Sequence, residues 1–129
     1  MGSGLSGLII QSSTVGDTAI GGNKVVETGV QIPPGYFVKG VRICYGLSNT
    51  RSFITQVRLV QVEDPPRSAR ALLDDDTDHT AAGPMCVDSQ ETSIDPARGA
   101  IRLSLRLEFG NTSDRIVLLA IGFNLALVP

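Results

Sequence analysis

The chain ends in an apolar run that restricts what it can fold into. Residues 116–128 read IVLLAIGFNLALV, and Asn124 is the only polar side chain among them. A strand that buries one face against a core alternates apolar and polar residues, because successive side chains point to opposite faces. This run is apolar on both faces, so both need cover. A small two-layer protein covers one face with its own core, and we expect the other to meet another part of the chain or another molecule.

If the run forms one regular strand, its side chains divide between two faces by odd and even position. One face carries Val117, Leu119, Ile121, Phe123, Leu125 and Leu127, and we assign it to the core. The other face is the candidate oligomer interface, and its residues are Ile116, Leu118, Ala120 and Val128. The apolar N-terminal segment, through Leu8 and Ile10, is a candidate for covering these residues.

Cover for this second face can come from an identical neighbour or from the same chain. An exposed apolar strand face is an aggregation liability, and a symmetric neighbour removes it. Loops or the N-terminal segment folded over the strand satisfy the same need within one molecule. We favour a homo-oligomer, and with it a non-enzymatic structural or assembly subunit.

The rest of the chain reads as short apolar segments separated by turns, without long helical periodicity. At 129 residues it has the size of one domain, in which we expect residues 1–4 to be a flexible start. Proline pairs and glycine-rich stretches end the segments, because proline cannot donate to a strand ladder. The pattern predicts an all-β fold, an antiparallel β-sandwich that is jelly-roll-like with about eight strands. We expect strands at 5–14, 24–32, 36–45, 51–62, 85–87, 100–109 and 116–128, with a short strand or a helical turn at 68–73.

The densest acidic cluster offers a candidate metal site. Asp74, Asp76 and Asp78 alternate along the sequence, as do the first ligands of a calcium loop. The match is incomplete, because His79 stands where the EF-hand loop has glycine and Met85 stands where it has its final glutamate. A solvated acidic loop is the simpler interpretation, and calcium is the cofactor to test.

A ligand-binding module is the alternative function. A carbohydrate-binding sandwich would combine calcium in the acidic loop with aromatic side chains for a glycan, and Tyr36 and Tyr45 are the candidates. Aromatic residues make up only 5% of the chain and tryptophan is absent, which argues against a sugar-stacking platform.

Other classes of function find little support in the sequence. The net charge of −2 does not provide the basic field that a general nucleic-acid binder needs. No apolar run reaches the length of a membrane-spanning helix. Catalysis through histidine would have to use His79, the only one, and no nucleophile elbow or paired metal-ligand motif is present. We therefore expect that the protein is not an enzyme.

Cys44 and Cys86 are the only cysteines, and both lie in apolar segments. They form one disulfide if the compartment is oxidising, or they remain two buried thiols. We favour buried thiols, because nothing in the sequence resembles a secretion signal.

Overall fold

We describe a computed structural model of the chain, which covers residues 8–11, 22–63 and 69–128. These residues form eight β-strands and one short 3-10 helix, so the predicted all-β class is confirmed. The strands are β1 (Leu8–Gln11), β2 (Gly22–Val30), β3 (Tyr36–Leu47), β4 (Phe53–Glu63), β5 (Ala69–Asp75), β6 (Met85–Asp88), β7 (Gly99–Phe109) and β8 (Arg115–Leu127), and the helix η1 is Pro96–Arg98.

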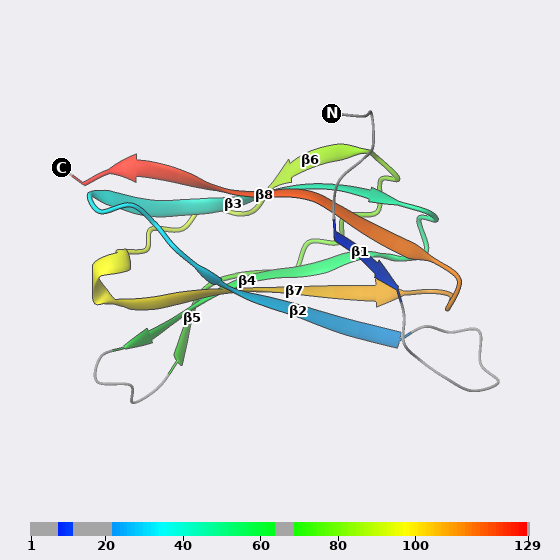
Figure 1. The fold of residues 1–129 in the computed structure, drawn as a ribbon, viewed down its shortest axis with the longest axis horizontal. Helices are drawn as coiled ribbons and strands as arrows, with labels where there is room; N and C mark the ends of the chain where they lie inside the picture. The colour runs from blue at the N-terminus through cyan, green and yellow to red at the C-terminus, as the bar shows by residue number, and fades with distance from the viewer. Residues whose placement is uncertain (1–7, 12–21, 64–68, 129) are drawn as a thin grey trace.

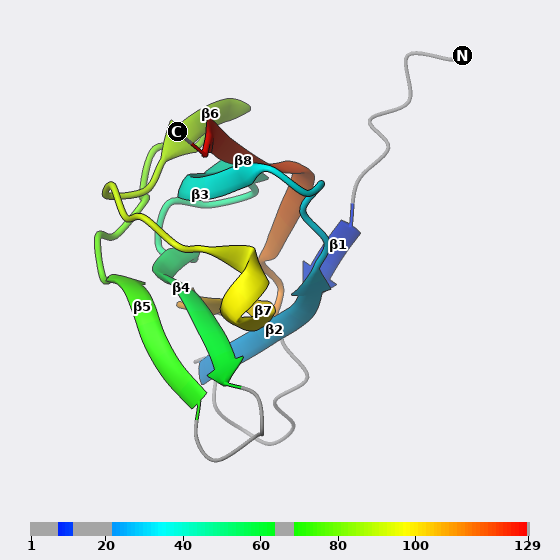
Figure 2. The same ribbon diagram turned by 90° about the vertical axis from the view of Figure 1, so that its left-hand side faces the viewer.

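The strands build two antiparallel sheets of four, in the orders β1-β8-β3-β6 and β2-β7-β4-β5. The first strand pairs with the last, the second with the seventh, the third with the sixth and the fourth with the fifth. This is the order of one long hairpin rolled into two layers, and it confirms the predicted jelly-roll-like sandwich. Figure 1 shows the two layers from the side, and Figure 2 shows the sandwich from the end where η1 lies.

Strand β7 shows how the sequence forms these sheets. Its apolar residues at every second position from Ile101 to Phe109 are buried, and Arg102, Arg106 and Glu108 between them are exposed. The inward side chains of β7 meet those of β3, β4 and β8 in one continuous core. A strand with one buried face is expected to alternate in this way.

Six of the predicted strands begin and end within two residues of observed strands, and two predicted segments, at 5–14 and 68–73, differ in length or type. The first strand was predicted at 5–14, and β1 is four residues long; the rest of that range lies outside the described residues, as do residues 1–4. In the segment predicted at 68–73, the described residues from Ala69 onward form a strand and not a helical turn, and this strand continues to Asp75. The acidic run therefore begins inside a strand.

Strand β8 contains a bulge that divides it into two halves. Tyr45 on β3 pairs with Leu118, and the next β3 residue, Cys44, pairs with Ala120. Leu119 is the extra residue in β8, and one extra residue in a strand reverses the alternation of the side chains that follow. Before the bulge the even-numbered residues point into the core, and after it the odd-numbered residues do, opposite Ile43 and Val41.

The bulge corrects part of the predicted interface. Ile116 and Leu118 are 0% and 4% exposed and belong to the core of the single chain, so their outward orientation was wrong. Ile10 is also in this core, beside Ile116 in the β1–β8 ladder. The physical reason is that the prediction assumed one unbroken alternation along thirteen residues, and the bulge breaks it.

Candidate functional site

Exposed apolar side chains gather at the C-terminal end of β8. Among the described residues, six large apolar side chains are more than a third exposed, and four of them lie between Ile121 and Val128. Ile121 and Leu125 are 37% and 38% exposed although they point toward the space between the sheets, and Leu127 is 72% exposed. A cluster of exposed apolar side chains on one strand is typical of a binding surface.

The same stretch has an unpaired backbone edge. β8 lies between β1 and β3, but β1 pairs only with Arg115–Leu118. Within the part of the chain that the structure describes, no strand pairs with that edge from Leu119 to Leu127. We call these nine residues the open edge. An edge strand presents a row of free N–H and C=O groups to any strand that can approach.

The other edges of the sandwich are blunted in ways that the open edge is not. β6 has four residues and follows Pro84, and β1 also has four. β2 carries Lys24 and Glu27, and β5 carries Arg70 and the aspartates of its end. Natural proteins protect edges by shortness and by charge. The open edge has the sequence LAIGFNLAL, which contains no charged residue and no proline.

The remaining interface candidates have different positions. Ala120 and Val128 are exposed; Ala120 lies on the outer face and Val128 follows the end of β8. Val128 donates a backbone hydrogen bond of 2.9 Å to the carbonyl oxygen of Gly35. The backbone of Leu8 pairs with that of Leu118, and its side chain lies outside the described part.

The acidic candidates are not brought together into a cation site. A side-chain nitrogen of Gln56 and one of Arg58 contact Asp74, at 2.6 and 3.3 Å, and the hydroxyl of Thr55 donates to Asp78 at 2.6 Å. Asp76 is exposed. Across residues 8–11, 22–63 and 69–128, no three side chains of histidine, cysteine or acid type converge as metal ligands would. The geometry gives the calcium hypothesis no support.

The sequence prediction of a metal site did not include Asp75, which is the buried aspartate of the acidic run. Its carboxylate accepts hydrogen bonds from the backbone N–H groups of Thr77, at 3.0 Å, and of Gln90, at 2.8 Å. Burial raises the pKa of Asp75. Hydrogen bonds from the side chain of Thr77 and from the backbone of Gln90 and Thr77, together with the electrostatic effect of His79, lower it by more, so its pKa lies below the usual value. Strand alternation could have predicted this burial, because Asp75 lies two residues after the inward-pointing Leu73 and therefore on the same face of β5.

The two tyrosine candidates do not form one platform. Tyr45 is 1% exposed, so its assignment to a ligand surface was wrong, and burial raises the pKa of its phenol. Its ring lies 6.3 Å from the ring of His79, which forms an isolated bridge with Ile54. Tyr36 is half-buried at the other end of β3, where it lines a hollow of about 530 Å³.

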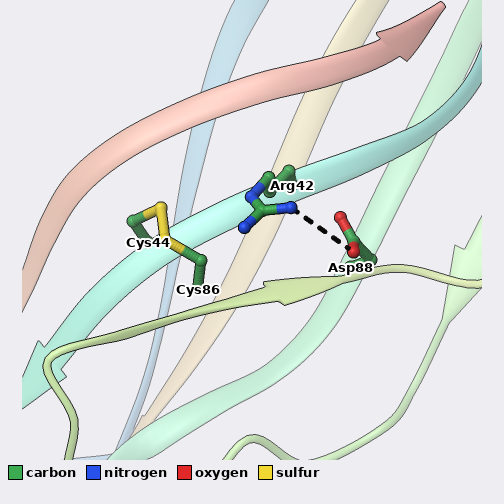
Figure 3. The surroundings of a disulfide bond; sticks show 4 residues. All are labelled: Arg42, Cys44, Cys86 and Asp88. Carbon is green, nitrogen blue, oxygen red and sulfur yellow. Dashed lines mark ion pairs between the residues drawn. A yellow bond between two sulfur atoms is a disulfide. The ribbon is translucent and has the colours of Figure 1, made fainter.

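The cysteines form a disulfide, which corrects the expectation of two buried thiols. Cys44 on β3 and Cys86 on β6 are directly paired residues, and their bond joins the edge strand to its neighbour. Both lie on the outer face of the sheet, where Cys86 is exposed. Figure 3 shows the bond beside the ion pair of Arg42 and Asp88, at 3.8 Å between nitrogen and oxygen. The prediction failed because side chains alternate along β3. Ile43 and Tyr45 point into the core, so Cys44 between them points to the outer face.

A buried carboxylate fixes the turn into β8. Asp114 accepts two hydrogen bonds from the guanidinium of Arg51, at 2.8 and 3.0 Å, and one from the hydroxyl of Ser52, at 2.6 Å. The hydrogen bond from Arg51 lowers the pKa of Asp114, burial opposes this, and Ser52 lowers it further. This network joins the β3–β4 loop to the β7–β8 loop, and sequence spacing alone gives no sign of it.

A groove of about 780 Å³ opens at the η1 end of the sandwich, between β5 and the loop before η1. The side-chain amide of Gln61 holds its wall by donating to the carbonyl oxygens of Asp95, at 2.7 Å, and Gly99, at 3.0 Å. None of the residues predicted from the sequence to bind a ligand or a metal lines this groove.

Comparison with known proteins adds no relative. No protein-family model, curated protein or solved structure matches the chain. In the described part of the chain, no helix has the length and apolar character to cross a membrane.

Proposed function

We propose that this protein is a non-enzymatic jelly-roll subunit that self-associates, and that a second copy of the chain covers the C-terminal half of β8. The observation that carries the proposal is the concentration of exposed apolar side chains on an unpaired edge. Jelly rolls serve both as assembly subunits and as ligand-binding domains, so the fold does not choose between these functions. The surface of β8 favours the first.

The arrangement of reactive side chains supports a non-enzymatic role. Both cysteines are joined in the disulfide, so neither provides a thiolate nucleophile. His79 lies against the ring of buried Tyr45, and its backbone N–H donates to the carbonyl oxygen of Ile54 at 2.9 Å. The alternative of a calcium-dependent glycan-binding module loses its main support, because Tyr45 is buried and Asp74, Asp76 and Asp78 have separate surroundings.

The proposal is tested by the molar mass of the purified protein in solution. Light scattering over a range of concentrations should give a mass above the 13.6 kDa of one chain, equally with and without a chelator. Leu125→Lys should reduce the mass to that of a monomer, because an inward-pointing charge on an edge strand opposes pairing. A wild-type protein that stays monomeric at high concentration would contradict the proposal.

Val25→Lys provides a matched control. Val25 is 48% exposed on β2, in the other sheet, and is therefore also a large apolar side chain on the surface. Its replacement removes a similar amount of exposed apolar area without touching β8. We expect this variant to keep the wild-type mass. Loss of association in both variants would point to nonspecific apolar contact and not to β8.

A further inference from the structure

The open edge also indicates how two copies would meet. We propose that β8 of one copy pairs antiparallel with β8 of a second copy across a two-fold axis at Phe123, so that the two four-stranded sheets join into one. This inference rests on the proposed function, self-association, and specifies how the two copies are arranged. An isologous contact of this kind uses the same surface on both copies and closes on itself, so it gives a dimer and no filament.

The sequence of the open edge is self-complementary under this symmetry. A two-fold axis at Phe123 places Ile121 opposite Leu125 of the second copy and Ala120 opposite Ala126 of the second copy. Leu119 meets Leu127 at the two ends, and Gly122 meets Asn124. Apart from Gly122 and Asn124, each side chain therefore faces an apolar one, and directly opposed apolar residues stabilise a pair of strands.

The length of the open edge fits the same axis. In the described part of the chain, the β1 ladder on this side of β8 stops at Leu118 and β8 ends at Leu127, so the stretch without a described partner there is nine residues with Phe123 at its centre. A second β8 can occupy it without displacing β1. Because the stretch lacks proline, every residue in it retains the backbone N–H that a ladder requires.

Side chains on the inward face would gain cover from this pairing. Ile121 and Leu125 point toward the space between the sheets but remain more than a third exposed. Phe123, between them, packs partly against the core. In the dimer, the inward side chains of each copy lie beside those of the other, which removes from water the apolar area that one chain leaves open.

The chain's own N-terminus is the competing occupant. In the β1–β8 ladder, Leu8 pairs with Leu118. The same register, continued toward the N-terminus, would place residues 1–7 opposite residues 119–125. Those residues lie outside the described part of the chain. Three of the seven are glycine, which is depleted in strands because it offers no side chain to pack. A second copy of β8 is the better match to an apolar edge.

Charge complementation tests whether two copies pair through β8 and whether the two strands pair in the register set by an axis at Phe123. Ile121→Lys and Leu125→Glu are prepared as separate variants, and light scattering should give each the mass of one chain. An equimolar mixture should recover the mass of two chains, because the lysine of one variant then faces the glutamate of the other across the axis. Ile121→Lys mixed with Leu125→Lys is the control, and this mixture should keep the mass of one chain, because two lysines would then face each other across the axis.

The outcomes separate the failure of this inference from that of the proposed function. A monomeric wild-type protein contradicts self-association itself. A wild-type oligomer that both variants leave intact contradicts edge pairing but not association, and a mixture that stays monomeric contradicts the axis at Phe123. If removal of residues 1–7 converts a monomeric wild type into a dimer, the N-terminus is the occupant of the open edge. Circular dichroism of each variant establishes that its β-structure is retained.

Discussion

The two edges of the sheet β1-β8-β3-β6 differ in how they are held and covered. At one edge, a disulfide and an ion pair fasten the four residues of β6 to β3. At the other, β1 pairs with Arg115–Leu118, and among the described residues no strand pairs with that side of β8 beyond Leu118. Both halves of β8 are apolar, yet Ile116 is buried and Leu125 is not. The comparison shows that the neighbours of a strand, and not its hydrophobicity alone, decide how much of it is covered.

Removing the disulfide tests how firmly the β6 edge is held. Replacement of both Cys44 and Cys86 by serine should lower the free energy of unfolding by about 3 to 4 kcal/mol, because the bond closes a loop between residues 42 positions apart. Denaturant unfolding of the oxidised wild type and the double variant measures the difference. A loss below about 1 kcal/mol would show that packing alone holds β6 in place.

Truncation on each side of the bulge sharpens the contrast within β8. Ile116→Ala should reduce the free energy of unfolding by about 3 kcal/mol, since it leaves a cavity in a closed core. Leu125→Ala, measured where the protein is monomeric, should cost less than about 1 kcal/mol, because part of that side chain is already in water. Similar losses at the two positions would mean that the second half is covered after all.

The buried carboxylate at the start of β8 fixes the covered half. Asp114→Ala removes the acceptor of three hydrogen bonds from Arg51 and Ser52, and we expect a loss of about 2 kcal/mol in the free energy of unfolding. Thermal unfolding of this variant beside Asp76→Ala, an exposed acid on the surface, checks the effect. Equal stability of the two variants would contradict a structural role for Asp114.

The same carboxylate predicts how stability depends on pH. Its pKa in the folded protein is lowered by Arg51 and Ser52, so the unfolded chain binds its proton more readily. The stabilisation is therefore present above the unfolded pKa of about 3.9 and is lost as the pH falls through the lower, folded value. The free energy of unfolding should decrease between about pH 5 and pH 2, and less steeply in Asp114→Ala.

The exposed ion pair beside the disulfide should matter least. Arg42 and Asp88 are both more than half exposed, and surface pairs of this kind contribute little because water and salt screen them. Arg42→Ala should change the free energy of unfolding by less than about 0.5 kcal/mol. A larger loss would mean that the β6 edge depends on charge as well as on the covalent bond.

Much of the fold follows from local patterns in the sequence. The alternation in 100–109 and the proline and glycine turns predict the strands and the sandwich, because they depend on residues close together in the chain. The candidate sites depend on residues far apart, and there the prediction was weaker. Tyr45 is buried and Asp78 pairs with Thr55, both because of the fold around them.

The sequence by itself determined the class of fold, the approximate strand positions and the apolar character of the C-terminal run. Only the tertiary structure decided which side chains of that run are covered, because the answer depends on one bulge at Leu119 and on where β1 stops pairing. A bulge is selected by how a strand must bend to meet two neighbours, and this requirement comes from the packing of the whole sandwich and not from the residues on either side of it.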